Sequence, residues 1–193
     1  MEFPMKGYVM GLIDVFSSLL NKYDLNLIIV GDGEGAQLLR DKISALSEIV
    51  RKKILYKNSI PYSEINIFFS RCDLFLGMGT TLLDASNHNV LALPVFPYLM
   101  DLKVSSLFLN NVNHLLADGP IKELSEVLNY LYSLSREEYN ELIKSQYNLV
   151  RINYSIDEFI SILLDSHVGI KKSNHYSRMI YSMAKNLHHY NRL

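Results

Sequence analysis

The chain has 193 residues, the length of one ordinary domain with a sizeable core. Hydrophobic residues make up 49% and charged residues 20%, which excludes an intrinsically disordered protein. The net charge of −1 gives no general attraction for nucleic acid, and the single cysteine, Cys72, excludes an internal disulfide.

Two absences from the sequence indicate the compartment. A transmembrane helix needs about 20 consecutive apolar residues, and no stretch of this chain approaches that length. Residues 1–10, MEFPMKGYVM, lack the charged and then apolar pattern of a signal peptide. We therefore expect a soluble, cytoplasmic protein, and we interpret Cys72 as a small buried residue in a reducing compartment.

In the first part of the chain, segments with apolar residues at helical spacing alternate with short continuous apolar runs. Apolar residues recur at helical spacing over 9–20 and again over 38–50, which predicts two helices. Short apolar runs at 25–30 (LNLIIV) and 53–59 (KILYKNS) predict strands, and the first of them continues into the glycine turn GDGEG. Pro61 opens a further helical pattern near its first turn, where the missing N–H is harmless.

Three more strands are predicted further along the chain. They are the apolar runs 73–78 (DLFLGM), 90–97 (VLALPVFP) and 114–118 (HLLAD), with a short helix over 80–89 after the first of them. Strands that alternate with helices at this spacing indicate βαβ units. We therefore expect an α/β fold with a Rossmann-like, doubly wound parallel sheet of about five strands, followed by C-terminal helices.

Three helices are predicted in series after the last strand. Two of them begin with capping boxes, Ser135 with Glu138 and Ser155 with Glu158. The last segment, 167–193, is basic and contains no acidic residue. We interpret it as a terminal helix with a solvated basic face; the alternative is an amphipathic helix that touches an anionic membrane or a partner domain.

The turn GMGTT (77–81) is the strongest candidate for a binding site. In a doubly wound sheet ligands bind beyond the carboxyl ends of the strands, where GDGEG and GMGTT both lie. Glycines let a diphosphate approach the N–H groups at a helix start, and the hydroxyls of Thr80 and Thr81 can add hydrogen bonds. Asp84, about one turn later, can accept hydrogen bonds from ribose. The ensemble suits a nucleoside diphosphate; the alternative is a tight turn in which Thr80 is an N-cap.

Other ligand motifs are missing from the sequence. It contains neither the dinucleotide fingerprint GxGxxG nor the P-loop GxxxxGK[ST]. The histidines are scattered and no Asp-x-Asp pair follows a strand, so we expect no metal site. His88 and His114 are interpreted as surface or capping residues, and 87–89 (NHN) as a helix end with an asparagine in the left-handed region. No catalytic residue is assigned.

Taken together, these motifs resemble the donor-binding C-terminal half of GT-B glycosyltransferases of the group 1, or family 4, type. The matching features are a Lys-Gly pair at 6–7 that opens a helix, an apolar strand ending in GDG, the helix opening IPYSE, the strand DLFLGM with its glycine turn, and LLDAS. The resemblance spans roughly 6–165. It implies a Rossmann-like donor-binding domain over 1–166, followed by the separate basic segment 167–193.

The resemblance also implies a role for single residues at the donor, a nucleoside-diphosphate sugar. Lys6 and the turn 77–81 would contact the diphosphate, 31–33 would line the donor crevice, and Asp84 would hold the ribose. The full set of implied donor-binding residues is Lys6, Gly31, Gly33, Gly77, Gly79, Thr80, Thr81 and Asp84.

Two features depart from the family. Retaining members carry two glutamates, and the earlier one, which attends the donor sugar, has no counterpart here. The family also has an N-terminal acceptor domain and a central strand before the Lys-Gly pair, and residues 1–8 supply neither. We therefore expect an incomplete domain whose acceptor half lies in a longer protein or in a second polypeptide. Without the central strand we expect lost ladder hydrogen bonds or altered sheet packing, and low stability of the isolated monomer.

The leading hypothesis is the donor half of a GT-B glycosyltransferase in glycan or polysaccharide synthesis, inactive without its acceptor domain. It would bind a nucleoside-diphosphate sugar as substrate, with no cofactor and no nucleic acid, and peripheral contact with the inner face of a membrane through 167–193 is an option. A non-catalytic interaction or remnant module on the same scaffold is the rival hypothesis, and a nucleotide-sugar epimerase is the third, because fold does not determine function.

Overall fold

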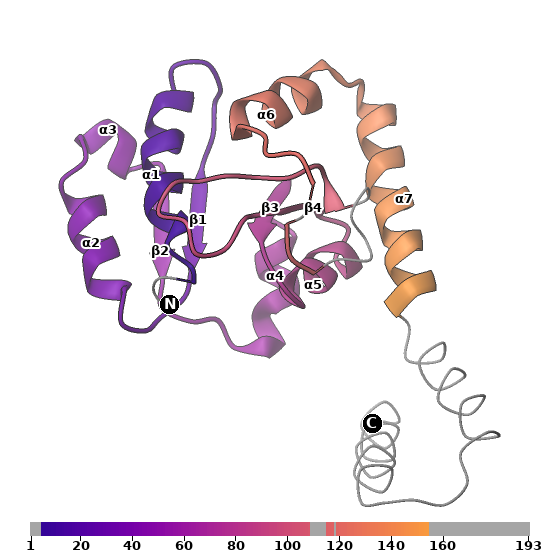
Figure 1. Cartoon of the computed structure of the whole chain (residues 1–193), viewed down its shortest axis with the longest axis horizontal. Coiled ribbons are helices and arrows are strands. Elements are labelled where there is room, and N and C mark those ends of the chain that lie inside the picture. Colours follow the sequence, from indigo (N-terminus) through magenta and orange to yellow (C-terminus); the bar gives the residue numbers. More distant parts are fainter. Residues whose placement is uncertain (1–4, 109–114, 118, 155–193) are drawn as a thin grey trace, which may run out of the picture. The chain divides into compact units, whose positions relative to one another are not determined.

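The computed structural model describes residues 5–108, 115–117 and 119–154 (Figure 1). The predictions that fall on 155–193 lie outside these residues. They are the third C-terminal helix, the capping box of Ser155 and Glu158, and the basic segment 167–193.

The described residues form a mixed α/β structure with two separate pairs of short parallel strands. In the first pair β1 (Leu27–Val30) lies beside β2 (Ile54–Lys57), with Leu27 opposite Ile54. In the second pair β3 (Leu74–Gly77) lies beside β4 (Leu91–Pro94), with Leu74 opposite Leu91. All four were predicted as strands, because each is a short apolar run next to a turn.

The expected five-stranded sheet is not found in the described part of the chain. Four strands form two two-stranded sheets, and residues 115–117 of the fifth predicted strand are not in a strand. The carbonyl of Leu115 instead accepts a hydrogen bond from the N–H of Gly79, at 2.5 Å. On the side of β4 that faces away from β3, Ser105 N–H donates to the carbonyl of Pro94 at 3.1 Å. This carbonyl is therefore not available to pair with a fifth strand.

Helices form where the apolar residues recur at helical spacing, except that one predicted helix is divided into two. They are α1 (Tyr8–Leu19), α2 (Ala36–Ser44), α3 (Glu48–Arg51), the 3₁₀ turn η1 (Tyr62–Glu64), α4 (Ile65–Phe69), α5 (Thr81–Asn87), α6 (Leu124–Ser133) and α7 (Arg136–Tyr154). The stripe at 38–50 was predicted as one helix and is two. Ser47, whose hydroxyl accepts a hydrogen bond from Val50 N–H at 3.5 Å, is the N-cap of a new short helix.

The hydrophobic core lies around α1 and β4. All four residues of β4 are buried, and Ile13 of α1 is fully buried. Gly11 lies where the loop after β4 crosses α1: a Cβ atom there would stand 2.4 Å from the backbone nitrogen of Leu102 and 2.7 Å from the carbonyl oxygen of Met100. The loop can approach α1 this closely because Gly11 has no side chain.

A buried side-chain amide closes the outer edge of β4. Gln146 of α7 is 1% exposed. Its Oε1 accepts a hydrogen bond from Ala92 N–H at 3.0 Å, and its Nε2 donates to the carbonyl of Val90 at 3.0 Å and to Ser86 Oγ at 2.8 Å. The amide therefore replaces the backbone of a neighbouring strand, which satisfies a buried donor and a buried acceptor that would otherwise be unpaired.

Two local predictions at helix ends are confirmed. Ser135 and Glu138 form the predicted capping box: Ser135 N–H donates to Glu138 Oε2 at 2.8 Å, and Glu138 N–H donates to Ser135 Oγ at 3.2 Å. The hydrogen bonds from Ser135 hold the pKa of Glu138 below its usual value. Asn89, in NHN, has a φ of 58°, the left-handed conformation that ends α5. No helix of the described residues is long and apolar enough to cross a membrane.

Alkaline solution is expected to destabilise the fold through two tyrosines. Burial raises the pKa of Tyr8 to about 12, and burial together with the charge of Asp73 raises that of Tyr139 to about 12; Tyr139 also donates from its hydroxyl to the carbonyl of Asp73 at 2.6 Å. A phenol with a raised folded pKa stabilises the fold below its unfolded pKa of about 10, and this contribution is lost as the pH rises towards 12.

Urea unfolding monitored by circular dichroism between pH 8 and 11.5 tests this expectation. The unfolding free energy should be level near pH 8 to 9 and fall above pH 10. Tyr139→Phe should weaken the fall, whereas Tyr62→Phe, at a tyrosine that is 76% exposed, should leave it unchanged. Equal curves for wild type and Tyr139→Phe would contradict the assignment to Tyr139.

Candidate functional site

The candidate site is built on the turn between β3 and α5. Gly77 ends β3, is buried, and its carbonyl accepts a hydrogen bond from Val95 N–H at 3.0 Å. A Cβ at Gly77 would lie 2.5 Å from Cε1 of Phe75. Gly79 has a φ of 68°, and among the described residues no heavy atom outside its chain neighbours lies within 4 Å of the position of a Cβ. The first glycine therefore makes room for an aromatic ring, and the second allows a left-handed turn in open space.

The two threonines after this turn are both exposed. Thr81 donates from its hydroxyl to the carbonyl of Met78 at 2.8 Å, which ties the turn together. Thr80 is the N-cap residue of α5, as the alternative interpretation of the turn predicted. Its side chain, however, makes no capping hydrogen bond. Within the described residues the backbone N–H groups of Thr80 and Thr81 have no hydrogen-bond acceptor, and both remain available to an anion.

The amide of Gly79 is not available in the same way. It donates to the carbonyl of Leu115 at 2.5 Å. The resemblance implied that Gly79 would face a phosphate, and in this structure its N–H is already paired with a segment 36 residues further along the chain. The anion-binding capacity of the turn therefore rests on Thr80 and Thr81.

The second predicted glycine turn, GDGEG, is closed by its own neighbours. Gly31 donates to the carbonyl of Lys57 at 3.0 Å, and its carbonyl accepts from the hydroxyl of Tyr56 at 2.8 Å. The N–H of Gly33 donates to Oδ1 of Asp32 at 2.9 Å. Both amides are committed and a carboxylate lies among them, so this turn can line a site but does not offer free donors to a phosphate.

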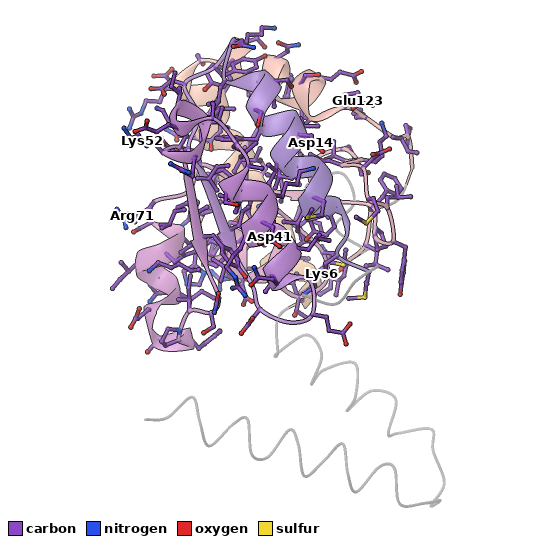
Figure 2. The ribbon with its side chains drawn as sticks, turned by 90° about the vertical axis from the view of Figure 1, so that its left-hand side faces the viewer. Lys6, Asp14, Asp41, Lys52, Arg71 and Glu123 are labelled. Atoms are coloured by element: carbon purple, nitrogen blue, oxygen red, sulfur yellow. The ribbon has the colours of Figure 1, made fainter. Side chains whose placement is uncertain are left out.

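Lys6 lies two residues before the start of α1. It is half-buried, and in the described part of the chain its ammonium forms no hydrogen bond or ion pair. Figure 2 shows it at one end of α1, well apart from Lys52 of α3. The carbonyl of its neighbour Met5 accepts a hydrogen bond from Tyr98 N–H at 3.1 Å, in the loop that follows β4.

Two backbone hydrogen bonds thus connect Lys6 with GMGTT. Val95 is bonded to Gly77 at the end of β3, and Tyr98, three residues later, is bonded to Met5. Met5, the residue before Lys6, and Gly77, four residues before α5 begins, are therefore both bonded to the segment 95–98. Among the described residues, no hydrogen bond joins Gly31 or Gly33 to this segment; theirs are to Lys57, Tyr56 and Asp32.

Asp84 completes the predicted set from within α5. It is half-buried, and its carboxylate has no hydrogen-bond or ion-pair partner among the described side chains. Its carbonyl lies 2.7 Å from Nδ1 of His88, the C-cap of α5. The ring of His88 stacks on Phe69 at 5.1 Å and its Nε2 contacts Asn66, which confirms the predicted capping role for this histidine.

Sequence reasoning missed Tyr98. This residue is 65% exposed and has a φ of 62°, a conformation that costs a non-glycine residue free energy. Its N–H donates a hydrogen bond to the carbonyl of Met5, the residue before Lys6, and this bond holds it there. The dipeptide at 97–98, Pro-Tyr, gives no signal for this conformation, because the partner that holds it, Met5, lies 93 residues earlier in the chain.

Within the residues that the structure describes, no group of three or more His, Cys, Asp or Glu side chains is gathered as a metal site. Comparison of the chain with models of protein families, with curated proteins and with solved structures found no match.

Proposed function

We propose that the chain is the donor-binding half of a glycosyltransferase of the GT-B type and binds a nucleoside-diphosphate sugar. One observation carries the proposal: Gly77, three residues before Thr80, and Met5, next to Lys6, are each hydrogen-bonded to the segment 95–98. Among the described residues, the N–H groups of Thr80 and Thr81 and the ammonium of Lys6 have no partner. Free backbone donors at a helix start and a lysine ammonium are groups that recognise a diphosphate.

The chemistry follows from these groups. The diphosphate is bound by Thr80 N–H, Thr81 N–H and the ammonium of Lys6, and the carboxylate of Asp84 accepts hydrogen bonds from the ribose. In glycosyl transfer the leaving nucleoside diphosphate gains negative charge in the transition state, so Lys6 and the two amides stabilise that charge. The acceptor and the catalytic base belong to another domain or chain.

In this proposal the two strand pairs are the halves of one doubly wound sheet. The turns after β1 and β3 are then at the same edge, because parallel strands end together. Gly31 and Gly33 line the donor crevice without donating to the phosphates, since their amides are already bonded.

A non-catalytic interaction module is the second candidate, and one observation favours it. The amide of Gly79, which was predicted to face a phosphate, is taken by Leu115, and that of Gly33, which was predicted to line the donor crevice, is taken by Asp32. A turn that serves only to connect β3 with α5 would show the same bonding. Nucleotide binding separates the two candidates.

Titration with uridine, guanosine and adenosine diphosphates, followed by NMR and calorimetry, tests the proposal. We expect one of them to bind and to shift the amide signals of Thr80 and Thr81 most strongly. Lys6→Ala removes a charge-assisted hydrogen bond worth about 1.5–3 kcal/mol, so the dissociation constant should rise about tenfold or more. Asp84→Ala should weaken nucleoside diphosphates but leave pyrophosphate binding unchanged, because it removes the ribose contact.

Lys52→Ala is the matched control. Lys52 pairs with Glu48 on the exposed helix α3 at 2.7 Å, and Figure 2 shows it far from Lys6, so its removal should leave the affinity unchanged. Absence of binding by all three nucleotides, or equal losses in Lys6→Ala and Lys52→Ala, would reject the donor site in favour of the interaction module.

A further inference from the structure

The turn after β1 contains an aspartate that is followed directly by a glycine, Asp32–Gly33. Both residues are exposed, and the N–H of Gly33 donates to Oδ1 of Asp32 at 2.9 Å. Among the described residues this N–H has no backbone acceptor, and it belongs to neither a helix nor a strand. A main-chain amide and the carboxyl group of the preceding side chain therefore lie against each other in contact with solvent.

This arrangement brings together the atoms of a five-membered ring. Covalent bonds already join the amide nitrogen of Gly33, through the carbonyl carbon, Cα and Cβ of Asp32, to the Cγ of its carboxyl group. The hydrogen bond folds the two ends of this series, N and Cγ, towards each other. Only the bond between N and Cγ is missing, and two groups that are held together in this way react faster than free ones.

The residue after an aspartate decides whether its nitrogen can attack the carboxyl carbon. Gly33 has a φ of 121°, a conformation that favours glycine, and it has no Cβ to shield the nitrogen. Two other aspartates are protected: Asp24 precedes a leucine and pairs with Lys53 at 2.7 Å, and the amide after Asp41 lies inside α2. Of the aspartates that the structure describes, only Asp32 precedes a glycine.

We propose that Asp32–Gly33 is a site of spontaneous covalent modification, at which the folded chain forms a succinimide and then isoaspartate. The nitrogen of Gly33 loses its proton and bonds to Cγ of Asp32, and the hydroxyl of the protonated carboxyl group leaves with that proton as water. A water molecule then opens the ring. Attack at Cγ breaks the N–Cγ bond and restores aspartate, whereas attack at the main-chain carbonyl carbon breaks its bond to N and leaves isoaspartate.

The product keeps the charge of aspartate but has a different main chain. In isoaspartate the chain runs through Cβ and Cγ, which adds one carbon atom to the turn, and the former carbonyl carbon of Asp32 becomes the free carboxylate. The turn is tied at both ends: Gly31 N–H donates to the carbonyl of Lys57 at 3.0 Å, and Ala36 N–H donates to that of Gly33 at 2.9 Å. A longer turn disturbs both hydrogen bonds, so the modified chain is less stable.

The reaction needs no partner other than water, and it holds whether or not the chain binds a nucleotide. Its product, however, offers a carboxylate in a position where an unmodified chain has none. Such a carboxylate is the substrate of methyltransferases that use S-adenosylmethionine to methylate isoaspartate. The modified turn is therefore recognisable by an enzyme of this class, which also serves as a reagent for detecting it.

Ageing of the full 193-residue chain for several weeks at neutral pH tests the inference. The chain is then cut with a protease that cleaves before aspartate but not before isoaspartate, and the peptides are identified by mass spectrometry. The peptide that contains 31–35 should first lose one water and then resist cleavage at Asp32. Isoaspartate should form there at least about tenfold faster than at Asp24 or Asp41, a difference of about 1.4 kcal/mol in activation free energy.

Two substitutions of Asp32 give the matched variants. Asp32→Glu keeps the charge but would need a larger ring, so it should abolish the reaction in this turn and preserve the melting temperature on ageing, which should fall in the wild type. Asp32→Asn releases ammonia instead of water and should react at least about tenfold faster than the wild type.

The synthetic peptide IVGDGEGA, with the sequence of residues 29–36, measures the rate without the fold. Because the folded turn holds the reacting groups together, the full chain should react at least as fast as this peptide. Reaction of the peptide while Asp32 of the folded chain stays unmodified would overturn the inference. Equal methyl incorporation into aged wild type and aged Asp32→Glu would overturn it as well, because the isoaspartate would then lie elsewhere, as at the second Asp–Gly pair, 118–119.

Discussion

Replacing Gln146 by leucine is expected to lower the free energy of unfolding by about 2–5 kcal/mol. Leucine fills a similar volume but cannot bond to Ala92 N–H or to the carbonyl of Val90. Both groups lie in the buried region next to β4, and each buried group left without a partner costs about 1–3 kcal/mol. Ser86 loses a donor as well, although its hydroxyl keeps its own hydrogen bond to the carbonyl of Leu82 at 2.8 Å.

Urea denaturation of the full chain, followed by circular dichroism, measures this loss. Gln37→Leu is the matched control, because Gln37 is an exposed glutamine on α2 whose amide bonds only to surface side chains. We expect a change within about 0.5 kcal/mol for the control. A loss below about 1 kcal/mol in Gln146→Leu would show that water or a shifted backbone satisfies the edge of β4.

The second large effect is expected at Gly11. In Gly11→Ala the new Cβ would stand 2.4 Å from Leu102 N and 2.7 Å from Met100 O. These are backbone atoms, so no side-chain rotation relieves the clash, and the loop after β4 must move away from α1. Overpacking of this kind costs about 1–3 kcal/mol, and here it opposes the gain of about 1 kcal/mol that alanine brings in a helix interior.

Gly11→Ala should also have a consequence at the candidate site. The displaced loop carries Tyr98, which bonds to Met5 beside Lys6. A lower unfolding free energy should therefore be accompanied by shifted amide signals of Tyr98 and Met5 in NMR spectra. Ser18→Ala, on an exposed face of the same helix, is the control and should change neither quantity. A more stable Gly11→Ala variant would show that the loop does not press on α1.

The order of elements could be predicted from the sequence, whereas the pairing of the strands could not. The runs LNLIIV and DLFLGM predict strands because they are short and apolar, and they form β1 and β3, of which only Ile29 and Gly77 are buried. Nothing in them states which edge of each strand is bonded. A five-stranded sheet was expected, and the described residues show two pairs instead, because pairing depends on neighbours that are distant in the chain.

For the candidate site, the sequence predicted which residues form the turn but not which of their N–H groups are free. The glycines of GMGTT were identified from their type and position, and Gly79 does adopt a positive φ. The free donors, however, are those of Thr80 and Thr81, since Leu115 takes the amide of Gly79. The connection of Lys6 to this turn through Tyr98 has no signature in the sequence, because it consists of backbone hydrogen bonds that any residue can form.

The sequence by itself determined the features that depend on a few consecutive residues: the capping box of Ser135 and Glu138, the left-handed Asn89, and the positions of the four strands. Tertiary structure alone decided that Gln146 pairs with Ala92, 54 residues away, and that Gly11 faces the backbone of Leu102. The physical reason is range. Propensity and capping act within about one helical turn, whereas a buried polar group or a close backbone contact takes its partner from whatever the fold brings beside it.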